Sequence, residues 1–135
     1  MITQIFSMST KIQTSIEPWL SVRSSAEAVQ FYKTAFGAVE TYRLEDPDGN
    51  AVVKLSIDGA GFWLSDAPSA NGPEIVGGDT IRMILTVEEP DVVFSDALKA
   101  GATQVFPVSE EHGWRLGRLI DPFGLHWEIG KQLNL

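Results

Sequence analysis

The sequence contains no cysteine, so disulfides, thiolate metal sites and cysteine nucleophiles are excluded. Basic residues are also few: 10 Lys and Arg stand against 18 Asp and Glu, a formal net charge of -8 at pH 7. Such a surface repels the phosphates of nucleic acids and anionic membranes, so we expect neither as a partner. No apolar run approaches the roughly 20 residues of a membrane helix, and the first 15 residues do not resemble a signal peptide. We therefore expect a cytoplasmic protein.

The first half of the chain alternates strand and helix patterns. Hydrophobic residues make up 44% of the 135 positions, which is enough for the core of one domain. Residues 16–22 alternate as a strand does, and Ser24 with Glu27 is typical of a helix start. Apolar residues then recur at helical spacing until Gly37, a typical helix end. Three further strands are predicted, over residues 38–44, 51–57 and 62–65.

The second half repeats this order. A strand over 81–87 precedes a helix with Pro90 in its first turn and Gly101 at its end. Strands are then predicted over 103–108, 115–120 and 125–130. The order predicts an α+β fold of two βαβββ modules. We divide the chain into an N-terminal tail (1–14) and a single domain (15–135) made of module one (15–66), a linker (67–79) and module two (80–131).

Several motifs resemble the vicinal oxygen chelate superfamily, which includes glyoxalases, bleomycin-resistance proteins and dioxygenases. They are Phe31-Tyr32 before Phe36-Gly37-Ala38, the helix end 97–102, and the turn Asp121-Pro122-Phe123-Gly124. Gly117-Arg118 before that turn, with Leu64-Ser65-Asp66, resembles the PhnB-like branch. The resemblance covers about residues 16–131. It implies a cupped mixed sheet around a small-molecule pocket and a homodimer, but it does not fix the reaction because the superfamily hosts many chemistries.

The resemblance also implies that metal-using members place ligands on the inward faces of the first and last strands of each module. Strand alternation maps those faces here. It assigns to the cup Glu17, Trp19, Ser21, Trp63, Ser65, Arg82, Ile84, Thr86, His126 and Glu128. It assigns to the helices Ile16, Pro18, Leu20, Val22, Phe62, Leu64, Ile81, Met83, Leu85, Val87, Trp127 and Ile129.

The four expected metal positions map to Glu17, to Trp63 or Ser65, to Arg82, and to Glu128. Arginine stays protonated and has no free lone pair, so it cannot ligate a metal. Tryptophan has no ligand atom, and serine is a weak ligand. The sequence therefore departs from the pattern of the metalloenzymes, and our leading expectation is a site without a cofactor.

Two interpretations of the polar residues remain open. In the first, Arg82 pairs with Glu17 or Glu128 and replaces the metal, and the pocket binds a small organic ligand through Trp19 and Trp63. In the second, Glu17, His126 and Glu128 hold a divalent metal such as Zn, Ni, Mn or Fe. A pocket that is only structural is a third, since aromatic residues are common in cores.

These interpretations lead to three candidate functions. The first is a small-molecule-binding, glyoxalase-like domain without a standard metal site. The second is a metal-dependent lyase, isomerase or dioxygenase, and the third is a drug-sequestering protein of the bleomycin-resistance type. In an enzyme, Glu128 is the best candidate for the catalytic general base. Trp114 and Arg115 are expected either at the lip of the pocket or at a sheet end.

Overall fold

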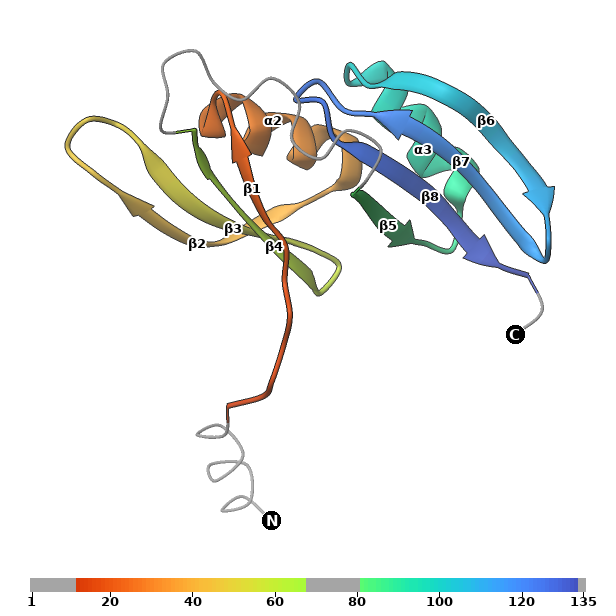
Figure 1. The fold of residues 1–135 in the computed structure, drawn as a ribbon, viewed down its shortest axis with the longest axis horizontal. Coiled ribbons are helices and arrows are strands. Elements are labelled where there is room, and N and C mark those ends of the chain that lie inside the picture. The colour runs from red at the N-terminus through yellow and green to blue at the C-terminus, as the bar shows by residue number, and fades with distance from the viewer. Residues whose placement is uncertain (1–11, 68–80, 134–135) are drawn as a thin grey trace.

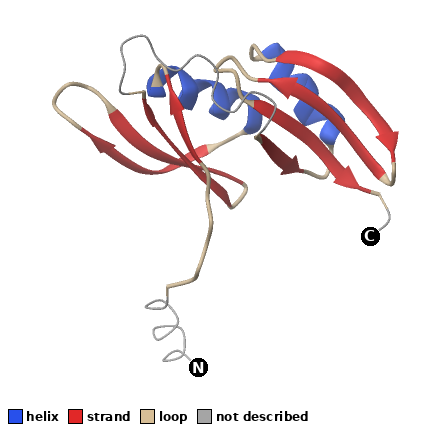
Figure 2. Ribbon diagram, viewed as in Figure 1, coloured by secondary structure: helices blue, strands red, loops and turns tan. Residues whose placement is uncertain are grey.

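The computed structural model describes residues 12–67 and 81–133, which form two four-stranded mixed sheets and two helices (Figures 1 and 2). Module one contains β1 (Trp19–Val22), α2 (Ser25–Phe36), β2 (Val39–Glu45), β3 (Ala51–Ile57) and β4 (Ala60–Asp66). Module two contains β5 (Arg82–Thr86), α3 (Pro90–Lys99), β6 (Thr103–Glu111), β7 (Trp114–Ile120) and β8 (His126–Gln132). In the part of the chain that the structure describes, no helix is long and apolar enough to cross a membrane.

The two sheets have the same topology. Their strand orders are β1-β4-β3-β2 and β5-β8-β7-β6. In each sheet the first strand runs parallel to the last, and the remaining pairs are antiparallel. The duplicated βαβββ architecture and the α+β class are therefore confirmed. Most of the predicted tail and linker lies outside the described residues, and the domain bounds stay a prediction.

Helix α2 begins and ends at the residues that the sequence predicted. The Ser24 hydroxyl accepts a hydrogen bond from the Glu27 N–H at 3.2 Å, which satisfies a free donor of the first turn. Gly37 ends the helix with a φ of 70°, a left-handed conformation that glycine adopts without a steric penalty. Helix α3 starts at Pro90, where the missing N–H costs no helical hydrogen bond.

Strand alternation correctly predicted which side chains the helices cover. Nine of the residues assigned to the helices lie in the core or pack against it: Leu20, Val22, Phe62, Leu64, Met83, Leu85, Val87, Trp127 and Ile129. The assignment was wrong for Ile16, Pro18 and Ile81, which are exposed. All three precede the observed strands, which begin at Trp19 and Arg82, so the chain there lies beyond the helix-covered part of each sheet.

A buried carboxylate joins the two modules. Asp121, only 3% exposed, lies in the turn between β7 and β8. It accepts hydrogen bonds from the Tyr32 hydroxyl at 2.6 Å, the Trp127 indole at 2.9 Å, and the Phe123 and Leu125 N–H groups. Tyr32 belongs to α2 of module one and is fully buried, so this contact fixes one module against the other.

The Tyr32–Asp121 contact leads to a stability prediction. We expect Tyr32→Phe to lower the free energy of unfolding by about 1–2 kcal/mol at neutral pH, because a buried carboxylate loses a donor. Tyr42, the other tyrosine, is 46% exposed, so Tyr42→Phe should change the value by less than about 0.5 kcal/mol. Urea unfolding followed by tryptophan fluorescence measures both. Equal effects would contradict the role given to Tyr32.

The same contact predicts a dependence on alkaline pH. Burial and the neighbouring Asp121 carboxylate raise the pKa of Tyr32 well above its ordinary value of 10.0. The neutral phenol is therefore favoured in the folded state. Its contribution to stability is fully present below pH 10.0 and is lost as the pH rises from there towards the folded pKa. As the pH rises above 10.0, wild-type protein should lose stability more steeply than Tyr32→Phe in urea unfolding. Parallel pH profiles would disprove the assignment.

Candidate functional site

The open side of the first sheet carries a group of aromatic side chains. Trp19 and Trp63 stack with ring centroids 6.0 Å apart and an interplanar angle of 13°, and Tyr42 contacts Trp63 edge-on at 5.5 Å. The Trp19 indole donates to Ser65 Oγ and the Trp63 indole donates to Glu17 Oε1, both at 2.9 Å. The polar atoms of both indoles are thus satisfied, while Trp19 remains 54% exposed.

An ion pair borders these rings. Glu17 lies 3.0 Å from the Lys54 ammonium, which itself lies 5.4 Å from the centroid of the Trp63 ring. Hydrogen bonds from Lys54 and Trp63 lower the pKa of Glu17. The Glu17 carboxylate is therefore ionised and already engaged by protein donors. We call this surface the aromatic face and define it by Glu17, Trp19, Tyr42, Lys54, Trp63 and Ser65.

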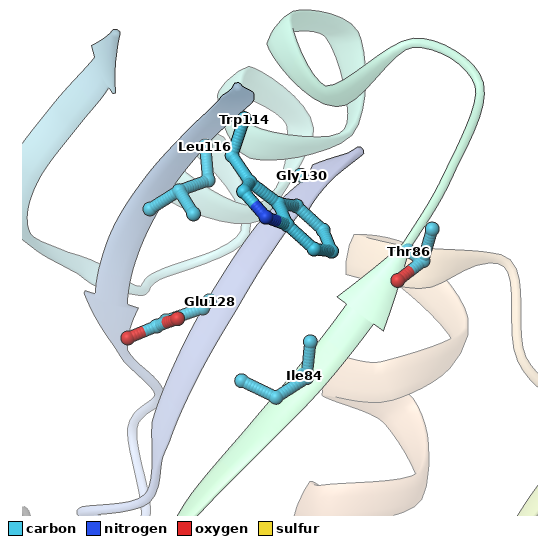
Figure 3. A pocket seen from close by; sticks show the side chains of 6 residues that line it. All are labelled: Ile84, Thr86, Trp114, Leu116, Glu128 and Gly130. Atoms are coloured by element: carbon cyan, nitrogen blue, oxygen red, sulfur yellow. The ribbon is translucent and has the colours of Figure 1, made fainter. Parts of the chain in front are cut away.

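The open side of the second sheet holds a pocket of about 350 Å³ (Figure 3). Its lining residues are Ile84, Thr86, Trp114, Leu116, Glu128 and Gly130. In Figure 3, the Trp114 indole lies near one end of the pocket, and the Glu128 carboxylate lies away from this indole. Arg82, on the edge strand β5, pairs with Glu128 at 3.2 Å. The pocket is thus a mostly apolar hollow with one carboxylate, and an arginine already contacts that carboxylate.

Arg118 and His126 form a second polar contact on this sheet. The Arg118 guanidinium lies 3.2 Å (Nε) and 2.9 Å (Nη2) from His126 Nδ1. A guanidinium can only donate, so Nδ1 acts as the acceptor and the ring proton is assigned to Nε2. In this contact His126 is a neutral ring that orients Arg118. We call Arg82, Arg118, His126 and Glu128 the polar cluster.

The structure brings some of the predicted site residues together and leaves others apart. Arg82 contacts Glu128, which is one of the two pairings in the first interpretation. Glu17 pairs instead with Lys54 of its own sheet. Among the described residues, no hydrogen bond or ion pair joins Glu17 to Arg82 or Glu128. Within one chain, the aromatic face and the polar cluster therefore occupy different sheets.

Sequence reasoning missed the contributions of the middle strands. Lys54 on β3 and Arg118 on β7 reach the open faces, because they lie opposite Trp63 and Glu128 in the register. We mapped only the first and last strands of each module, although the same alternation applied to the middle ones. Trp114 lines the pocket, as expected for a lip residue. Arg115 follows the other alternative, since it lies at the start of β7 and pairs with Asp91 of α3 at 2.6 Å.

The residues present do not fit a divalent metal within one chain. In the described ranges, no three His, Asp or Glu side chains converge closely enough to hold one. One of the expected ligand positions carries Arg82, whose charge repels cations. Two others carry Glu128 and Glu17, whose carboxylates already pair with Arg82 and Lys54. His126 Nδ1 accepts from Arg118, so this nitrogen is not available as a metal ligand.

Sequence comparison places the chain among known proteins. It is 37% identical to the protein Mb0911c of Mycobacterium bovis, over 94% of this chain and 89% of that protein. It is 32% identical to the protein At5g48480 of Arabidopsis thaliana, over 75% of this chain and 68% of that protein. A family model described as glyoxalase At5g48480-like, N-terminal domain, matches residues 20–66. The chain belongs to the vicinal oxygen chelate superfamily.

Structural comparison agrees with membership of this superfamily. The fosfomycin resistance protein FosX of Listeria monocytogenes, in complex with Mn(II) and sulfate, superposes with a TM-score of 0.65 at 17% identity. The alignment covers 90% of this chain and 93% of FosX. Identity this low supports the shared fold alone. The finer placement of this superfamily member in the PhnB-like branch stays a prediction.

The pocket floor depends on the absence of a side chain at residue 130. A Cβ there would lie 2.5 Å from the Leu116 Cβ and 2.6 Å from the Arg115 carbonyl oxygen, so Gly130→Ala should cost about 1–3 kcal/mol of unfolding free energy. Gly61→Ala is the matched control. Its added methyl would meet only the ends of the flexible Glu17 and Lys54 side chains, so we expect less than about 1 kcal/mol. Urea unfolding compares the two, and equal losses would contradict this close packing.

Proposed function

We propose that this superfamily member binds a small organic ligand on its open sheet faces, without a divalent metal at the position that the superfamily's metalloenzymes use. The ion pair between Arg82 and Glu128 carries this proposal. The Glu128 side chain is only 17% exposed, so the nearby guanidinium compensates its charge in a partly desolvated position. Since arginine cannot ligate a metal, this site favours an organic ligand.

The chemistry of the two faces supports ligand binding. The pocket of about 350 Å³ falls within the usual size range of small-molecule sites and has the usual apolar lining with few polar groups. The aromatic face offers exposed ring surface with its indole N–H groups already satisfied. Such rings bind flat apolar groups at little conformational cost.

A homodimer would complete the site. Trp19 and Ile84 are 54% and 60% exposed, and they lie on β1 and β5, which are edge strands of their sheets. Large exposed apolar side chains on unpaired edges favour association. We infer that the aromatic face of one chain lies opposite the pocket of a second copy, and that the protein works in the cytoplasm.

Two alternative functions use the same residues. A metal-dependent lyase, isomerase or dioxygenase would need Glu17, His126 and Glu128 to converge, with Glu128 as the general base. A drug-sequestering protein would need only an open aromatic surface and no turnover. The exposed Trp19 and Tyr42 rings favour this second alternative over the first.

Metal content tests the proposal directly. Protein purified without chelators should contain well below one transition metal ion per chain when measured by plasma mass spectrometry. Glu128→Ala should leave this value unchanged. Stoichiometric metal in wild-type protein that is lost in Glu128→Ala would overturn the metal-free site and support the enzyme alternative.

Subunit mixing tests the shared site. Phenylnaphthylamine, a neutral fluorescent probe, should bind wild-type protein, and Trp19→Ala and Ile84→Ala should each weaken it about tenfold, a cost of about 1.4 kcal/mol. Mixing the two variants should restore strong binding, because one of the two sites in each heterodimer then draws only on unaltered faces. A lack of recovery after subunit exchange, or a monomer at micromolar concentration, would contradict the inferred dimer.

A further inference from the structure

The polar cluster carries an uncompensated positive charge in an acidic protein. The chain as a whole has a formal net charge of -8. Within the polar cluster, however, Arg82 and Arg118 stand against the single carboxylate of Glu128. Glu111, which the register puts on the same side of the sheet, lies opposite Trp114, four residues along β7 from Arg118. His126 adds no charge in the tautomer that its contact with Arg118 requires. The polar cluster therefore has one surplus cation.

Comparison of the two modules shows how this surplus arises. Lys54 and Arg118 occupy equivalent places, since each lies on the third strand of its module opposite the fourth. In module one, the Glu17 carboxylate neutralises Lys54 at 3.0 Å. In module two, Arg82 stands at the position equivalent to Glu17. Arg82 pairs with the Glu128 carboxylate at 3.2 Å, so this carboxylate does not neutralise Arg118. Among the described residues, no carboxylate lies within 4.0 Å of Arg118.

Arg118 is held in place by a neutral partner. Its Nε and one terminal nitrogen face His126 Nδ1, which leaves the remaining N–H donors of the guanidinium for another group. The side chain is half-buried and is held by these two contacts. A guanidinium fixed in this way is suited to bidentate binding of an oxyanion.

The pocket lies beside this arginine. Glu128 lines the pocket and faces Arg118 across the β7–β8 register. We infer that the ligand of this site is an organic anion, with an apolar body in the pocket and a carboxylate or phosphate at Arg118, near Arg82. This inference rests on the proposed ligand-binding function and adds the chemical class of the ligand.

Two probes that differ by one acidic group test the inference. Anilinonaphthalene sulfonate has nearly the same apolar body as phenylnaphthylamine and adds a sulfonate that stands in for the oxyanion. Fluorescence titration of wild-type protein should give about tenfold tighter binding of the sulfonate. Arg118→Gln should remove this preference and change phenylnaphthylamine binding by less than about twofold, since only the charge-assisted contact is lost.

Matched variants separate charge from folding. Arg118→Lys should retain part of the preference, because the charge remains while the planar donor pair is lost. Arg43→Gln is the control, since Arg43 lies opposite the buried Val53 and pairs with Glu40, away from the open faces. Circular dichroism should show the same unfolding transition in Arg118→Lys as in wild type.

The outcomes distinguish the two proposals. If both probes bind wild-type protein equally, or if Arg118→Gln weakens both to the same extent, the anion inference is wrong and the ligand-binding proposal survives. If neither probe binds, both are wrong. A sulfonate preference that is lost in Arg118→Gln and kept in Arg43→Gln supports the inference.

Discussion

The single core shared by both modules is the constraint on which the rest of the structure depends. Helices α2 and α3 contact each other and cover one side of the two sheets, and the buried Asp121 carboxylate fastens the turn of module two to Tyr32 of module one. Because each strand alternates its side chains, covering one side leaves the other available for aromatic and charged residues. The position of the candidate site follows from this arrangement.

The duplicated modules share a backbone but differ in their chemistry. Equivalent strand pairs carry Trp19 beside Trp63 in module one and Ile84 beside Glu128 in module two. One face therefore presents stacked rings, while the other presents an apolar hollow with a polar cluster. Such a division suits a ligand that has a flat or apolar body and a charged group, and neither module alone offers both in full.

The sequence was a reliable guide where the physics is local. The Ser24 cap, the glycine end of α2 and the alternation of buried residues all depend on a few neighbouring positions, and the structure confirms them. Errors arose at strand ends. Ile16 and Ile81 fit the alternation, but they lie before the paired residues and have no helix over them. Alternation gives the side to which a residue points, but not where the covered surface stops.

The sequence by itself determined the two βαβββ modules and the presence of Arg82 at the position equivalent to Glu17, because these depend on residue type and spacing. Only the tertiary structure decided the partners of the charges. Arg82 meets Glu128, Glu17 meets Lys54, and Arg118 meets His126, since strand register brings together residues far apart in the chain. Two carboxylates, three cationic side chains and one imidazole can pair in several ways, and the geometry of the folded sheets selects among them.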